Sequence, residues 1–117
     1  MKRFCFRDIE GKEIKCYKWT TSEKPKGIVQ VVHGMTEYAL RYDYFAEKLC
    51  ENGYTVYAHD HRGHGETSKE DEERGYIADN EGFDILVEDV KELTDIIKEE
   101  NPNVPIILKY KHFNSKD

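Results

Sequence analysis

The sequence lacks the long apolar run of a membrane-spanning helix, the cysteine pattern of a disulfide-bonded protein and the apolar stretch of a signal peptide. No run approaches the ~18 consecutive apolar residues that a membrane-spanning helix needs. The three cysteines, Cys5, Cys16 and Cys50, form no C-x-x-C pair and have no metal-ligand spacing, which favours reduced thiols over a disulfide framework. Residues 1–8 are repeatedly charged and cannot supply the apolar stretch of a signal peptide. We therefore expect a cytoplasmic protein.

Positive charge is also scarce. The formal net charge is −6 at pH 7, and residues 66–100 hold 14 acidic against four basic side chains. Binding to nucleic acid depends on clustered Lys and Arg that displace counterions from phosphates, so we exclude nucleic acid as a partner. The acidic side chains of residues 82–100 are expected to face solvent.

The composition nevertheless predicts a folded core. Hydrophobic residues make up 38% and aromatic residues 12% of the 117 residues, too large a share for a disordered chain. A chain of this length forms one compact unit at most. Because it contains no internal repeat, low-complexity tract or linker, we expect one domain or part of one.

Apolar spacing predicts five strands and two helices. The first two strands are joined by a turn containing Gly11, which suits the tight reversal of an antiparallel hairpin. The later strands alternate with the helices, which is typical of an α/β fold with a doubly wound, mostly parallel sheet in three layers. The predicted strands are Arg3–Arg7, Glu13–Trp19, Ile28–Val32, Tyr54–His59 and a buried Val104–Leu108; the predicted helices are Glu37–Glu51, capped by Thr36, and Gly82–Glu100.

Two motifs rich in glycine and histidine follow the third and fourth predicted strands. In the first, residues 33–37, Gly34 has no Cβ and lets the backbone approach closely, so the amides of this turn can hold an oxyanion. In the second, residues 60–65, Gly63 and Gly65 permit positive φ angles.

The second motif also allows a different interpretation. His59, His61 and His64 reproduce the histidine spacing of the metallo-β-lactamase signature H-x-H-x-D-H, in which a loop delivers imidazoles to zinc. That signature requires an aspartate where this chain has Gly63, and no later set of His, Cys and Asp supplies the remaining ligands. A metal-dependent hydrolase is therefore the weakest of the hypotheses considered.

The two motifs and the residues between them resemble the monoacylglycerol lipase and lysophospholipase branch of the α/β-hydrolase superfamily. The resemblance covers Arg3 to Leu108, and several separated motifs in the same order make it specific. Related branches, such as epoxide hydrolases and haloalkane dehalogenases, usually carry a proline where this chain has Thr36, which favours the lipase branch. The matching residues are His33-Gly34-Met35-Thr36-Glu37, Arg41-Tyr42, Phe45-Ala46, Leu49, Gly53-Tyr54 and Ala58-His59-Asp60-His61-Arg62-Gly63-His64-Gly65.

The resemblance implies a partial α/β-hydrolase fold and a serine hydrolase that cleaves carboxylic esters of lipids, lysolipids or other small acyl compounds without a metal or organic cofactor. Resemblance to peptidases of the same superfamily leaves an amide open as the alternative to an ester. It makes the Met35 amide one donor of the oxyanion hole, where each donor stabilises the transition state by about 3 kcal/mol. His33 and Gly34 support this turn, and the His33 ring is expected to bond neighbouring loops rather than act as the catalytic base. The structural loop beside the site comprises Asp60, Arg62, Gly63, His64 and Gly65.

Under this resemblance the nucleophile is missing. The superfamily carries its catalytic serine in G-x-S-x-G directly after the strand predicted here as the last one. Ser22, Ser68 and Ser115 all lie outside such a motif, and the acid and base of the triad belong to later segments. We therefore expect residues 1–108 to be the amino-terminal part of an α/β-hydrolase domain, residues 109–117 to be a divergent polar tail, and the chain to be a truncated, inactive hydrolase.

A further hypothesis is a non-catalytic binding or dimerising module derived from the same fold. Without additional strands, Val104–Leu108 lies at the edge of the sheet and can pair with another chain. Missing cover on the sheet faces also predicts marginal stability or self-association.

Overall fold

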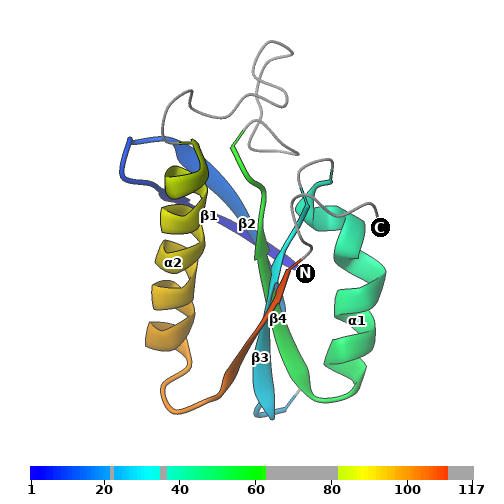
Figure 1. Cartoon of the computed structure of the whole chain (residues 1–117). Coiled ribbons are helices and arrows are strands. Elements are labelled where there is room, and N and C mark those ends of the chain that lie inside the picture. The colour runs from blue at the N-terminus through cyan, green and yellow to red at the C-terminus, as the bar shows by residue number, and fades with distance from the viewer. Residues whose placement is uncertain (22, 35–36, 63–81, 111–117) are drawn as a thin grey trace.

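The computed structural model describes residues 1–21, 23–34, 37–62 and 82–110, with the backbone alone for residues 82 and 83. They form a five-stranded mixed sheet with a helix against each face, which gives three layers (Figure 1). The predicted α/β architecture is thereby confirmed. In chain order the elements are β1 (Lys2–Arg7), β2 (Glu13–Trp19), β3 (Gly27–Val32), the 3₁₀ turn η1 (Ala39–Tyr42), α1 (Asp43–Glu51), β4 (Tyr54–His59), α2 (Gly82–Glu100) and β5 (Ile106–Tyr110).

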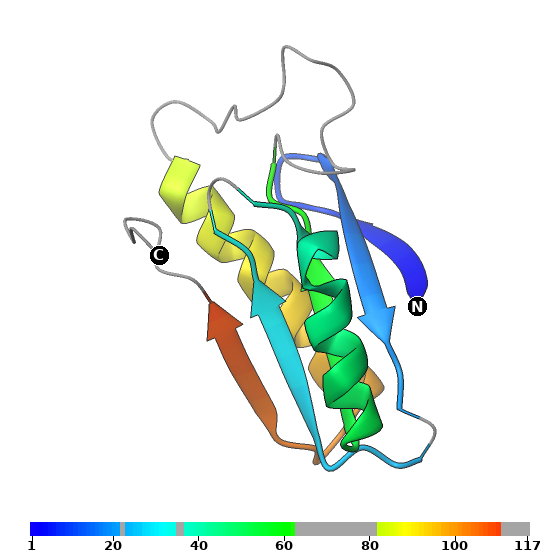
Figure 2. The ribbon, with the colours of Figure 1, turned by 90° about the vertical axis from the view of Figure 1, so that its right-hand side faces the viewer.

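The sheet combines an antiparallel hairpin with parallel crossovers. Its strand order is β1-β2-β4-β3-β5; β2 pairs antiparallel with β1 and β4, whereas β3 pairs in parallel with β4 and β5. Gly11, in the turn between β1 and β2, has a φ of 77°, which residues with a Cβ disfavour. Figure 2 shows β5 at one edge of the sheet, on the side away from the hairpin. The predicted hairpin and order of elements are confirmed.

The sheet separates two apolar layers, because successive side chains of a strand point to opposite faces. β3 is buried along its whole length, as its nearly continuous apolar sequence predicts for a central strand. The layer under α1 contains Tyr17, Trp19, Val29, Val31, Ala46, Val56 and Ala58, and the layer under α2 contains Ile14, Cys16, Ile28, Tyr57, Leu93 and Ile97.

The first helix begins later than predicted. α1 starts at Asp43, after η1, whereas the prediction of a helix from Glu37 is wrong. The residues in between are engaged by other segments: the Glu37 side chain accepts a hydrogen bond from the Gly34 amide at 2.7 Å, and the Ala39 amide donates to the Asp60 side chain at 2.8 Å. These contacts hold the backbone in a tertiary network in place of a helical turn.

The last strand is shifted and exposed, so the prediction of a buried strand at Val104–Leu108 is wrong in both respects. β5 runs from Ile106 to Tyr110. Pro105 has no amide hydrogen for a ladder, but its carbonyl accepts a hydrogen bond from the Ile28 amide at 2.8 Å, and the parallel pairing with β3 starts from there. Within the described ranges β5 has one neighbouring strand, and most of its side chains are exposed. The boundary expected after residue 108 falls inside this strand.

The second helix has the predicted bounds, but two of its side chains differ from expectation. The helical spacing of apolar residues predicts one buried stripe that includes Leu86, Val87 and Val90, but Val87 is 41% exposed. Asp89 belongs to the acidic residues expected to face solvent and is fully buried. In the part of the chain that the structure describes, neither helix combines the length and apolarity needed to cross a bilayer.

Candidate functional site

The His33–Gly34 turn lies where β3 ends, at the carboxyl edge of the parallel part of the sheet. The His61 amide donates to His33 Nε2 at 2.9 Å, so the ring proton is on Nδ1, which donates to the Gly34 carbonyl at 2.6 Å. In return, His61 Nε2 donates to the His33 carbonyl at 2.8 Å. The buried His33 ring therefore joins the turn after β3 to the segment after β4.

Glu37 closes the same turn from its other end. Its Oε1 accepts hydrogen bonds from the Gly34 amide at 2.7 Å and from the Tyr42 hydroxyl at 2.9 Å, and its own amide donates to the Gly34 carbonyl at 3.1 Å. Burial, followed by the hydrogen bond to Glu37, raises the pKa of Tyr42 to about 12, so this hydroxyl stays a donor at neutral pH. The Gly34 amide is thus bound within the protein.

Asp60, the residue after β4, braces the turn from the α1 face of the sheet. Its Oδ2 accepts from the Tyr17 hydroxyl at 2.5 Å and its Oδ1 from the Ala39 amide at 2.8 Å. Its backbone amide donates to the Lys15 carbonyl at 2.9 Å. Both carboxylate oxygens have a donor, which compensates for the near-complete burial of this side chain.

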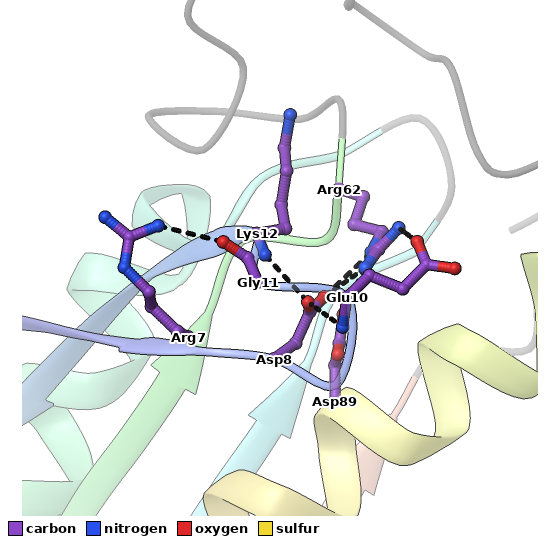
Figure 3. Close-up of polar contacts among 7 residues, drawn as sticks. All are labelled: Arg7, Asp8, Glu10, Gly11, Lys12, Arg62 and Asp89. Atoms are coloured by element: carbon purple, nitrogen blue, oxygen red, sulfur yellow. Dashed lines mark hydrogen bonds and ion pairs between the residues drawn. The ribbon is translucent and has the colours of Figure 1, made fainter.

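Arg62 extends this brace to the α2 face of the sheet (Figure 3). Its Nε donates to Asp8 Oδ2 at 2.9 Å, and its Nη2 donates to the same oxygen. Its Nη1 donates to Glu10 Oε1 at 2.6 Å, and Asp89 of α2 lies 3.6 Å from Nε. One guanidinium therefore ties the segment after β4 to the hairpin turn and to α2.

The histidines considered as zinc ligands are only partly described. His59 and His61 pack edge to face with ring centroids 5.2 Å apart, and His64 lies outside the described residues. Burial, followed by the charge of His61, lowers the pKa of His59, so its ring is neutral. Among the residues that the structure places, no group of three His, Cys, Asp or Glu side chains is arranged to hold a metal.

The structure brings four of the proposed site residues into one network around the ends of β3 and β4. These are His33 and Gly34 in the turn and Asp60 and Arg62 in the brace. The proposed oxyanion donor itself is not among the described residues. Outside the described ranges lie Met35, Thr36, Gly63, His64 and Gly65.

Several partners in this network were missed by reasoning from the sequence: Tyr17, Glu37, Asp8 and Asp89. For Asp89 a signal was available, because it lies three residues after Leu86 and four before Leu93, which places it on the buried stripe of the helix. Glu37 stands three residues after Gly34 in the same motif, so its contact is local. Tyr17 and Asp8 are joined to the site by contacts that no local sequence spacing reveals.

The mixed sheet, the helix on each face and the braced His-Gly turn at the carboxyl edge define part of an α/β hydrolase. The family model described as "Serine aminopeptidase, S33" matches residues 23–109, and the chain belongs to this family.

Monoglyceride lipases are among its relatives. "Monoglyceride lipase" of Mus musculus is 37% identical over 101 residues, which cover 86% of this chain and 31% of the mouse protein. "Monoacylglycerol lipase" of Mycolicibacterium smegmatis is 35% identical over 103 residues, which cover 88% of this chain and 35% of that protein. This chain therefore spans about a third of the length of these curated relatives.

A solved structure extends the likeness to three dimensions. The thermostable carboxyl esterase of Bacillus coagulans, in complex with glycerol, superposes with a TM-score of 0.81 at 35% sequence identity, covering 92% of this chain and 34% of the esterase. The family resemblance expected from the motifs is confirmed.

Proposed function

We propose that this chain is the amino-terminal part of a monoacylglycerol lipase-like serine hydrolase, whose complete form cleaves carboxylic esters of lipids, lysolipids or small acyl compounds. The observation that carries the proposal is the braced His33–Gly34 turn at the carboxyl edge of the sheet. The named activities of the relatives, monoglyceride lipases and a carboxyl esterase, support an acyl ester as the substrate class.

The turn's hydrogen bonds support the assignment of the oxyanion donor. The Gly34 amide donates to Glu37 and is therefore occupied. The next amide along the chain belongs to Met35, to which we assign the donor role. Stabilisation of the developing negative charge by one such preorganised amide is worth about 3 kcal/mol.

We propose further that the chain is inactive by itself. Its three serines, Ser22, Ser68 and Ser115, all lie outside a G-x-S-x-G motif, so none is held in the strained turn that exposes the nucleophile in this superfamily. An amide that stabilises an oxyanion lowers the barrier only when a nucleophile attacks the same carbonyl.

Labelling with a fluorophosphonate probe tests this proposal. Purified chain is expected to remain unlabelled and to hydrolyse p-nitrophenyl acetate no faster than buffer, alongside an active serine esterase as the positive control. Stoichiometric labelling that disappears in Ser115→Ala and persists in Ser22→Ala would show that the tail supplies a working nucleophile and would contradict the proposal.

One observation favours a second function, a binding or dimerising module. On β5, Ile107 is 52%, Leu108 48% and Tyr110 62% exposed, at an edge of the sheet. Such an edge can pair with another chain. A module of this kind gives a defined dimer by size-exclusion chromatography with light scattering. Leu108→Lys is expected to dissociate the dimer, whereas Val87→Lys, a control on α2 at a residue that is 41% exposed, is expected to leave it intact. A monomer at all concentrations contradicts it.

We also propose a reducing, cytoplasmic location. Cys5, Cys16 and Cys50 are all free thiols. Three unpaired cysteines, including the exposed Cys5, suit a compartment in which thiols stay reduced. Alkylation of all three thiols in protein from rapidly quenched cells is the expected result, and a disulfide involving Cys5 contradicts it.

A further inference from the structure

Two buried carboxyl groups meet a single guanidinium on the α2 face of the sheet (Figure 3). The side chains of Asp8 and Asp89 are both fully buried, and that of Arg62 is 9% exposed. Glu10, the third acid in contact with Arg62, is 51% exposed, so solvent screens its charge. One buried positive charge balances one buried negative charge, and a second carboxylate in the same place is uncompensated.

Asp8 is the carboxyl group that holds the negative charge. Its Oδ1 accepts hydrogen bonds from the Glu10 and Lys12 amides, both at 2.9 Å, and its Oδ2 accepts two from Arg62. Burial by itself raises the pKa of Asp8, but the donors from Arg62 and the two amides outweigh it and bring this pKa below the usual value. Four donors leave Asp8 no need for a proton.

Asp89, unlike Asp8, has no set of hydrogen-bond donors around its carboxyl group among the described residues. Its contact with Arg62 is an ion pair at 3.6 Å, and neither of its oxygens accepts a hydrogen bond from the described residues. Burial, followed by the charge of Asp8, raises the pKa of Asp89 to about 8. Glu92, on the same helix, adds a further negative charge, and Cys16 of β2, whose pKa burial raises, is a neutral thiol.

We propose that Asp89 holds a proton at neutral pH and donates it in a hydrogen bond to Asp8, so that Asp8, Asp89 and Arg62 form a one-proton latch. The latch joins three segments that are distant in sequence: the turn between β1 and β2, the segment after β4, and α2. The proton supplies the donor that two carboxylates facing each other lack. Its loss places two like charges against one guanidinium and weakens the attachment of α2.

The latch is connected through the chain to the His33–Gly34 turn at the candidate site. His61 directly precedes Arg62, and its amide and ring hold His33. A change in the attachment of Arg62 therefore acts on the segment that braces the His33–Gly34 turn.

The pH dependence follows from the direction of the Asp89 shift. The folded protein binds this proton more tightly than the unfolded chain, so the contribution to stability is complete below the ordinary pKa of aspartate. It is lost progressively as the pH rises toward about 8, and above that value no further loss occurs.

Urea denaturation of wild type and Asp89→Asn between pH 5.5 and 9 tests the latch. Asparagine has the shape of protonated aspartate and donates a hydrogen bond to Asp8 without titrating. The ratio of the wild-type to the variant unfolding constant is expected to rise about tenfold per pH unit up to pH 8 and to level off above it. Asp95→Asn, an exposed carboxylate on the same helix, serves as the matched control and is expected to follow wild type. Parallel curves for wild type and Asp89→Asn would overturn the proposal.

Titration of the wild-type protein measures the protonation of Asp89 directly and does not depend on whether Asp89→Asn folds. In wild-type protein labelled with ¹³C at the aspartate carboxyl carbons, the Asp89 resonance, assigned through its backbone, is expected to titrate near pH 8, and that of Asp8 to remain ionised from pH 5 upward. An Asp89 resonance that is already ionised at pH 6 rules the latch out.

Discussion

Asp60 and Asp89 are both buried carboxyl groups, but they lie on opposite faces of the sheet and meet different partners. Asp60 belongs to the segment after β4, whereas Asp89 belongs to α2 and contacts that segment through Arg62. Asp60 accepts hydrogen bonds from the Tyr17 hydroxyl and the Ala39 amide, one on each oxygen. Asp89 has a 3.6 Å ion pair with Arg62 and another carboxylate beside it. Two carboxyl groups that are equally withdrawn from solvent therefore differ in the hydrogen-bond donors that reach their oxygens.

The largest effect is expected from Arg62→Met, which removes the positive charge on the Asp89 side of the comparison. Asp8 then loses two donors and its counter-charge while it stays buried. Breaking a buried pair in this way destabilises by about 3 kcal/mol or more. Urea denaturation followed by the fluorescence of Trp19, the single tryptophan, measures the loss.

Two variants control this prediction. Arg41→Met removes an arginine that is 58% exposed and lies 4.0 Å from the Glu37 carboxylate. This variant is expected to change the free energy of unfolding by less than about 1 kcal/mol. Asp8→Asn in the Arg62→Met background removes the uncompensated charge and is expected to restore part of the stability. Equal losses for Arg62→Met and Arg41→Met would show that the guanidinium balances no buried charge.

A smaller effect, about 2 kcal/mol, is expected from Asp60→Asn on the other side of the comparison. The substitution exchanges a charged acceptor for a neutral amide, whose NH₂ group faces a donor, the Tyr17 hydroxyl or the Ala39 amide. Denaturation at pH 6 and pH 8 is expected to give a loss at both values. At pH 8, by contrast, Asp89→Asn is expected to stabilise. If both substitutions shift stability in the same direction at pH 8, the two carboxyl groups do not differ as described.

Most strands and helices of the fold were predictable from the sequence, because the apolar patterns that indicate them are local. The nearly continuous apolar run of β3 predicted a central strand, and the apolar stripe of α2 predicted a helix; the structure contains both. The start of α1 was not predictable, since Tyr38, Tyr42 and Phe45 have helical spacing. The intervening backbone is held elsewhere, because Glu37 binds Gly34 and the Ala39 amide binds Asp60. The shift of β5 follows from pairing with β3, which no window around Pro105 reveals.

The candidate site was predictable only in part, for a related reason. His33, Gly34, Asp60 and Arg62 stand in motifs, and the structure connects all four. The partners of Asp60 and Arg62 are separated from them by long stretches of chain, 43 positions between Tyr17 and Asp60 and 54 between Asp8 and Arg62. Neighbours of this kind depend on the packing of whole segments, so the sequence motif gives one half of each of these two pairs.

The smallest effect, about 1 kcal/mol, is expected from Tyr17→Phe. This substitution removes one hydrogen-bond donor from Asp60 and leaves the aromatic ring in the core. Asp60 keeps the Ala39 amide, so its carboxylate remains partly satisfied. Thermal unfolding followed by circular dichroism avoids the tyrosine's influence on Trp19 fluorescence, and Tyr44→Phe, at a residue that is 73% exposed, provides the control. In the double variant with Asp60→Asn, the loss is expected to be smaller than the sum of the two single losses, because both remove the same hydrogen bond. Additive losses would mean that Tyr17 stabilises the fold through its ring alone, and that Asp60 is held by its backbone partners.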